Sequence, residues 1–174
     1  MIFQNREEAG HCLAGALQQY RDHPDGVILA LPRGGVAVGY AMSLDLHLPL
    51  DVLITRKIGA PQNPEYALGA ISETGNIYLN LEAGGAFGLS HAYIEKLAKV
   101  HREEILRRQR LYRRGRPPRN LKDRLVILAD DGIATGATFF ASVEAIRRQQ
   151  PRSLLAAISR RTARNHRPRE GGGG

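Results

Sequence analysis

Apolar positions along the chain follow two spacings, one typical of amphipathic helices and the other of buried strands. Four segments have helical spacing: 6–21, 36–46, 90–114 and 135–149. Four short, mainly apolar runs have the length of strands: 27–31, 50–54, 125–129 and 153–158. Such runs suit parallel strands that are covered on both faces. Because helices and strands alternate, we predict an α/β fold with an open, mainly parallel sheet and helices on both faces.

One part of the chain breaks this alternation. Tyr66–Ile71 and Asn76–Leu79 flank the turn residues Glu73-Thr74-Gly75, which predicts an antiparallel hairpin. The residues before it contain Gly59, Pro61 and Pro64, and this composition predicts a flexible loop.

The first helix and the 90–114 helix can be described more closely. Asn5 with Glu8 three residues on predicts the start of the first helix. Cys12 falls on the apolar side of that helix, so we expect a buried, unreactive thiol. Five residues are expected to face inward from the 90–114 helix: Tyr93, Leu97, Val100, Ile105 and Leu111.

Composition narrows the class of protein. The chain has 174 residues, enough for one domain, and a formal net charge of +8. Ten basic residues lie from Lys96 to Arg119. They form either a solvated face of the helix or a patch that binds a phosphate-rich partner. Aromatic residues are not interleaved with them, so nucleic-acid binding is only weakly supported. The sequence does not start like a secretory signal, it has a single cysteine, and it has no apolar run of roughly 18 residues. We therefore expect a cytoplasmic protein without membrane contact.

The segment 125–138 carries the candidate chemistry. An apolar strand ends in Asp130 and Asp131, and a short loop then enters a helix through Thr135-Gly136-Ala137-Thr138. The unpaired amides and positive dipole at a helix start favour a phosphate. The two carboxylates would repel that phosphate, and they suit sugar hydroxyls or a hydrated metal ion better. These residues therefore predict a site for a sugar with a phosphate at one end.

This segment resembles the phosphoribosyl diphosphate (PRPP) signature of the type I phosphoribosyltransferase family, in which a strand is followed by two acids and Thr-Gly-x-Thr. The resemblance extends over about residues 5–158. It implies that eight residues bind the ribose and its 5′-phosphate: Asp130, Asp131, Gly132, Ala134, Thr135, Gly136, Ala137 and Thr138.

Two further segments resemble parts of the same family. Leu31-Pro32-Arg33-Gly34-Gly35 is similar to the loop that holds diphosphate. The glycines would offer backbone amides to the diphosphate, and the Arg33 side chain would donate hydrogen bonds to it. The run from Arg56 to Pro61 is similar to the mobile loop that covers the active site. The resemblance implies that Arg56 and Lys57 bind the departing diphosphate.

The resemblance also implies a reaction. A nitrogen acceptor, such as a nucleobase, would displace diphosphate from PRPP, and Mg²⁺ would be held mainly by PRPP and not by direct protein ligands. Asp130, Asp131 and Lys57 would be catalytic. Ala134 stands where the 6-oxopurine branch has an aspartate that transfers a proton, so that subclass is not expected. Adenine-type, orotate-type and non-nucleobase acceptors stay open. The alternatives are a PRPP- or nucleotide-sensing regulator that contacts nucleic acid, and a shortened domain without turnover.

The end of the chain differs from the family pattern. Residues 159–174 contain five arginines and end in four glycines, a composition that predicts disorder and not a further helix and strand. We expect that this tail is not a native continuation of the fold and that it comes from a reading-frame shift or an altered gene end. A basic tail that binds nucleic acid is the alternative. The shortened sheet would expose apolar surface, so we also expect a homodimer.

Overall fold

The computed structural model describes residues 3–60, 63–75, 77–79, 91–132 and 137–159. Its main sheet has four parallel strands in the order β2–β1–β6–β7. The strands are β1 (Gly26–Ala30), β2 (Leu50–Val52), β6 (Leu125–Asp130) and β7 (Ser153–Ile158). All five residues of β1 are buried, as are the first five of β6, because helices cover both faces. The predicted α/β class with a mainly parallel sheet is confirmed.

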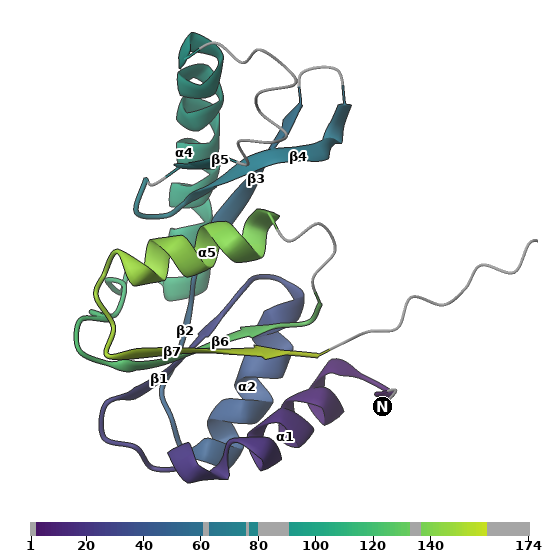
Figure 1. Cartoon of the computed structure of the whole chain (residues 1–174), viewed down its shortest axis with the longest axis vertical. Helices are drawn as coiled ribbons and strands as arrows, with labels where there is room; N and C mark the ends of the chain where they lie inside the picture. The colour runs from purple at the N-terminus through teal and green to yellow at the C-terminus, as the bar shows by residue number, and fades with distance from the viewer. Residues whose placement is uncertain (1–2, 61–62, 76, 80–90, 133–136, 160–174) are drawn as a thin grey trace, which may run out of the picture.

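The main sheet separates two apolar layers of the core, and helices cover each of them (Figure 1). α1 (Arg6–Ala16) and α2 (Gly34–Leu46) pack on one face, where Ile28 and Ile127 meet Met42. α5 (Ala137–Arg147) covers the other face, where Leu29 and Leu128 meet Ile146. A 3₁₀ helix, η1 (Gln18–Tyr20), follows α1. None of the described helices combines the length and apolar character needed to cross a membrane.

A second, antiparallel sheet contains β3 (Thr55–Ala60), β4 (Asn63–Ser72) and β5 (Ile77–Leu79), and it packs against α4 (His91–Arg113) (Figure 1). The prediction of a loop from Arg56 onward is therefore wrong, because these residues pair with β4 as far as Ala60. Gly59 is accommodated by an irregularity in the pairing, while Ile58 and Ala60 on either side are buried. Burial of the apolar residues outweighs the weak strand preference of glycine.

The first helix begins as predicted but presents a different face. The Asn5 side chain accepts a hydrogen bond from the Glu8 amide at 2.8 Å. Cys12, expected to be buried, is exposed. The small residues face α2 instead, and a Cβ added to Gly10 would lie only 2.6 Å from the Ala41 Cβ. The close approach of the two helices selects the side with the smallest residues.

Two residues expected to face inward from α4 are exposed. Val100 is 59% exposed and Leu111 is 62% exposed, whereas Ala98 and Ile105 are buried. α4 packs on one side only, and the buried residues repeat at an interval of seven. Val100 and Leu111 lie on the opposite side of the same helix.

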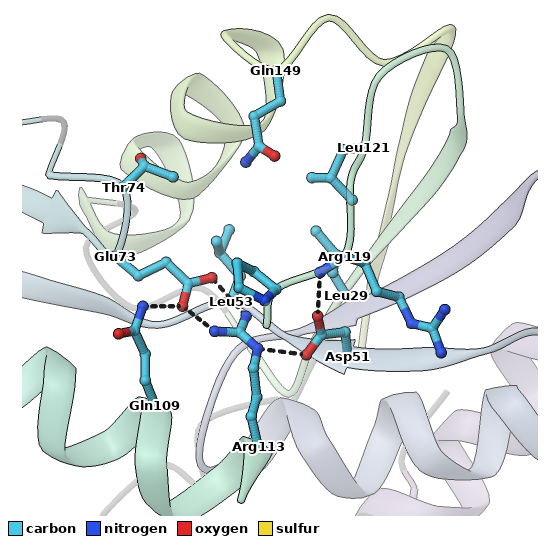
Figure 2. Close-up of a pocket in the computed structure, with 11 residues that line it drawn as sticks. Leu29, Asp51, Leu53, Glu73, Thr74, Gln109, Arg113, Arg119, Leu121 and Gln149 are labelled. Atoms are coloured by element: carbon cyan, nitrogen blue, oxygen red, sulfur yellow. Dashed lines mark hydrogen bonds and ion pairs between the residues drawn. The ribbon is translucent and has the colours of Figure 1, made fainter. Parts of the chain in front are cut away.

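A buried ion-pair network, formed by Arg113, Glu73 and Asp51, joins the two sheets (Figure 2). The Arg113 guanidinium donates to both carboxylate oxygens of Glu73, at 2.6 and 2.8 Å, and its Nε donates to Asp51 at 2.9 Å. The three side chains are between 5 and 11% exposed. Gln109 also donates to Glu73, and the Arg119 amide donates to Asp51. The end of α4 and the turn after β4 are thereby fixed to the edge strand β2.

Replacing Arg113 by Met should strongly destabilise the fold, because Glu73 and Asp51 would stay buried without their cation. We expect the free energy of unfolding to fall by about 3–5 kcal/mol. Urea denaturation followed by circular dichroism measures this loss. Arg110→Met, at an exposed position of the same helix, is the control and should change stability by less than ~0.5 kcal/mol. Similar losses in both variants would show that the network does not stabilise the joint.

Candidate functional site

The carboxyl ends of β1 and β6 meet in the middle of the main sheet. Ala30 and Ala129 are partners in the parallel register, and the Leu31 amide donates to the Ala129 carbonyl at 3.0 Å. The segments that follow these strands therefore lie side by side. Ligands of open α/β sheets bind at this edge. The segments 31–35 and 130–131, which the resemblance assigns to the diphosphate and the ribose of one ligand, are thus neighbours in the structure.

Gly34 and Gly35 are required by the contacts they make with the two aspartates. A Cβ added to Gly34 would lie 1.9 Å from Oδ2 of Asp131. A Cβ added to Gly35 would lie 2.7 Å from the Ala129 carbonyl oxygen and 3.3 Å from Oδ1 of Asp130. The space of the missing side chains is taken by the aspartate segment, so the start of α2 and the end of β6 contact each other directly.

Two residues that sequence analysis did not place in the site also belong to it. Arg6, the first residue of α1, donates from Nε to Oδ2 of Asp131 at 2.7 Å. Ser159 is buried, and it donates from its amide to the Asp130 carbonyl and from its hydroxyl to the Asp131 carbonyl. Ser159 follows β7 at the same edge, so its position could have been inferred, whereas sequence analysis assigned it to the tail. Nothing in the sequence indicated the role of Arg6.

The two aspartates occupy different environments. Burial, with the neighbouring Asp131 carboxylate in a smaller part, raises the pKa of Asp130 to about 6, and the hydrogen bond from the Asp131 amide opposes this rise. Asp131 is paired with a cation and its side chain is 27% exposed. One carboxyl group is thus close to its titration range near neutral pH, while the other is neutralised by Arg6.

The remaining residues predicted for the site are placed only in part. Thr138 lies in the first turn of α5, with Ser142 donating to its carbonyl, and Ala137 begins that helix. Ala134, Thr135 and Gly136 lie outside the described residues, as does the rest of the predicted tail, 160–174. Arg33 is exposed just before α2 and is joined to Pro32 by a cis peptide bond.

Arg56 and Lys57 are adjacent in β3 and lie on opposite sides of it. Thr55 contacts Ser142 of α5 through their hydroxyl groups at 2.8 Å, and Lys57 shares that side of the strand. Arg56 is on the side of Ile58, which packs against α4. Burial, with the charge of Arg56 as a smaller cause, lowers the pKa of His101 on α4. Strand alternation therefore turns Arg56 toward α4, on the side of β3 opposite to Lys57, and the expected binding of diphosphate by the two residues stays a prediction.

The donor set of the site suits Mg²⁺ only when a ligand supplies further oxygens. The described residues contain no group of three or more His, Cys, Asp or Glu that could hold a metal ion. Magnesium is commonly bound by one or two carboxylates together with substrate phosphates and water. Asp130 and Asp131 match the protein's share of such a site.

Comparisons with known proteins identify the family of the chain. The model of the phosphoribosyl transferase domain family matches residues 1–170. Two curated relatives, from two strains of Mycobacterium tuberculosis and each named "Putative phosphoribosyl transferase", are 38% identical over 157 residues, which is 90% of this chain. The chain spans 35% of the length of those relatives. It belongs to the phosphoribosyl transferase domain family, and the resemblance inferred from the sequence is confirmed.

Solved structures support the same fold. The crystal structure of TT1426 from Thermus thermophilus is similar with a TM-score of 0.74 and 40% identity, over 91% of this chain and 74% of that one. A purine phosphoribosyltransferase from Pyrococcus horikoshii is similar with a TM-score of 0.51 and 19% identity, over the same shares of the two chains. The second likeness concerns the fold alone.

The raised pKa of Asp130 predicts how stability depends on pH. Since the folded-state pKa lies above the ordinary value, the native protein binds more protons than the unfolded chain between about pH 4 and 6. The free energy of unfolding therefore falls progressively as the pH rises through this window and Asp130 ionises. Asp130→Asn removes the charge and keeps an acceptor for the Asp131 amide.

We expect Asp130→Asn to be more stable than the wild type at pH 7.5 by about 1 kcal/mol, once solvent screening is allowed for. That corresponds to a rise of ~3 °C in Tm. At pH 4 the two Tm values should agree to within ~1 °C. Thermal denaturation across this range decides the matter, and parallel Tm curves for the two proteins would contradict the assignment.

Proposed function

We propose that this chain binds PRPP and transfers its phosphoribosyl group to a nitrogen acceptor, with release of diphosphate. The observation that supports this most strongly is the contact between the Asp131 carboxylate and Gly34, where the ends of β1 and β6 meet. This contact places a carboxylate that suits sugar hydroxyls next to the backbone at Gly34, which suits phosphate oxygens.

The roles of the residues follow from their chemistry. Asp130 and Asp131 accept hydrogen bonds from the ribose hydroxyls, and the 5′-phosphate binds residues 135–138, of which Ala137 and Thr138 begin α5. Gly34 presents its backbone amide to the diphosphate, whereas the Gly35 amide donates to the Leu31 carbonyl at 3.0 Å and contributes by leaving room beside the ligand. Arg33 and Lys57 supply positive charge to the diphosphate. Each element thus serves one part of an elongated ligand with two anionic ends.

Catalysis in this proposal is mainly electrostatic. Departure of diphosphate leaves positive charge on the ribose ring in the transition state, as in glycosidic cleavage. The carboxylates beneath the ring favour that charge, while Arg33 and Lys57 favour the charge of the leaving group. Mg²⁺, held mainly by PRPP, would supply further neutralisation of the diphosphate.

The acceptor is restricted by one residue. The side chain of Ala134 cannot accept or donate a proton. The 6-oxopurine branch that the sequence resembles has a proton-transferring aspartate at this position. We therefore propose acceptors other than 6-oxopurines: adenine-type bases, orotate-type bases or amines that are not nucleobases.

The direct test is a panel of these acceptors with PRPP and Mg²⁺, with hypoxanthine and guanine as the 6-oxopurine arm. Diphosphate release is the measured quantity. We expect release with at least one of the proposed acceptors. For the acceptor that is active, Asp131→Asn should lower kcat/KM at least tenfold, because a charged acceptor of sugar hydrogen bonds is lost. A panel without release above the rate of PRPP alone would contradict transfer activity, and an unchanged Asp131→Asn variant would remove Asp131 from the site.

The opposite orientations of Lys57 and Arg56 provide a matched pair of variants. Lys57→Met should lower turnover about tenfold, because a cation near the leaving diphosphate is lost, while affinity for ribose 5-phosphate stays the same. Arg56→Met alters the neighbouring residue on the α4 side and should leave turnover within about twofold. Steady-state kinetics and calorimetry measure both quantities. Equal losses in the two variants would show that strand integrity, and not the Lys57 charge, is responsible.

A further inference from the structure

The ion pair between Arg6 and Asp131 brings a cation from the first helix to the carboxyl edge of the main sheet. α1 starts beside the carboxyl ends of β6 and β7 (Figure 1). Oδ2 of Asp131 contacts Arg6 Nε on one side and fills the space of a Gly34 side chain on the other. The Arg6 guanidinium therefore lies next to Gly34 at the start of α2, where the proposed function places the diphosphate.

The pair with Asp131 uses only part of the guanidinium. Nε donates to Asp131, and the terminal nitrogens of Arg6 make no hydrogen bond or ion pair with any residue in the described part of the chain. The side chain is 49% exposed. A guanidinium has five N–H groups in a planar fork, and the described residues use only one of those of Arg6. Phosphate oxygens are the groups that this fork binds best.

Electrostatics requires a cation at this position. Two aspartates stand at the end of β6, and an anion placed beside them would be repelled by both when they are ionised. Arg33 contributes a positive charge from the preceding loop, but its side chain is exposed and Arg33 makes no side-chain bond that caps α2. Arg6 is the cation that is already held against the acidic pair, at 2.7 Å from Asp131. It neutralises one carboxylate without ordering a further side chain when the ligand arrives.

From these observations we propose that Arg6 is a substrate-binding residue: its terminal nitrogens bind the diphosphate of PRPP while Nε holds Asp131. The inference rests on the proposed function and extends it, because it assigns a direct ligand contact to the first helix. It also implies that Arg6 acts on the ligand itself and not only through Asp131.

The experiment is a double-mutant cycle measured by titration calorimetry in the presence of Mg²⁺. Wild type, Arg6→Ala, Asp131→Asn and the double variant are each titrated with PRPP, with diphosphate and with ribose 5-phosphate. We expect Arg6→Ala to weaken PRPP and diphosphate binding about tenfold and ribose 5-phosphate binding less than twofold. In the Asp131→Asn background, Arg6→Ala should still cost at least threefold for PRPP.

Arg21→Ala is the control for loss of an exposed charge. Arg21 is 47% exposed and pairs with Asp22 beyond the other end of α1, so the variant should bind all three ligands as the wild type does. Thermal denaturation checks that each variant is folded, and Arg6→Gln replaces Arg6→Ala if the latter is not.

The outcomes separate the two claims. If the wild type binds neither PRPP nor diphosphate, the proposed function and this inference both fail. If the wild type binds PRPP and the Arg6 variant binds it equally well, only the inference fails. It also fails if removing Arg6 has no effect once Asp131 is replaced, or if ribose 5-phosphate is lost as strongly as PRPP, because Arg6 would then act through the sugar site alone.

Discussion

The parallel pairing of β1 with β6 is the constraint on which the candidate site depends. Because Ala30 and Ala129 are partners, the chain leaves both strands at the same edge, and the next residues must share a small volume. Only glycine at position 34 leaves room for the Asp131 carboxylate, since a Cβ would lie 1.9 Å from it. Strand register, glycine and carboxylate are therefore parts of a single packing arrangement. The residues proposed to bind the diphosphate and the ribose cannot move apart without breaking it.

A second arrangement determines where the antiparallel sheet sits. Arg113 joins Glu73 in the turn after β4 to Asp51 in β2, with all three side chains almost fully buried. Removing a single partner would leave uncompensated charge in the interior, so such a network persists or fails as a unit. The hydroxyls of Thr55 and Ser142 provide another contact, between this sheet and α5. Lys57 is thus carried on a strand anchored at its base to both the edge strand and α5.

Much of this could be predicted from the sequence, and the exceptions have physical reasons. The apolar runs predicted the four parallel strands, and the order of strand, two acids and Thr-Gly-Ala-Thr predicted the site at the end of β6. Local patterns could not reveal contacts between distant segments: Arg6 and Asp131 are 125 positions apart. The β3 strand was hidden by glycine and proline, which mark loops on average but were outweighed here by burial of Ile58 and Ala60. Cys12 was placed on the wrong side because helix contact favoured the smaller Gly10.

A crystal structure of the protein with Mg²⁺ and PRPP tests the central claim most directly. The account predicts the ribose hydroxyls on Asp130 and Asp131, the diphosphate against Gly34 and Gly35, and the 5′-phosphate at the start of α5. Density for PRPP elsewhere, such as in the cleft beside Arg113, Glu73 and Gln149 in Figure 2, would contradict it. So would PRPP bound at the edge of β1 and β6 with its diphosphate turned away from the two glycines.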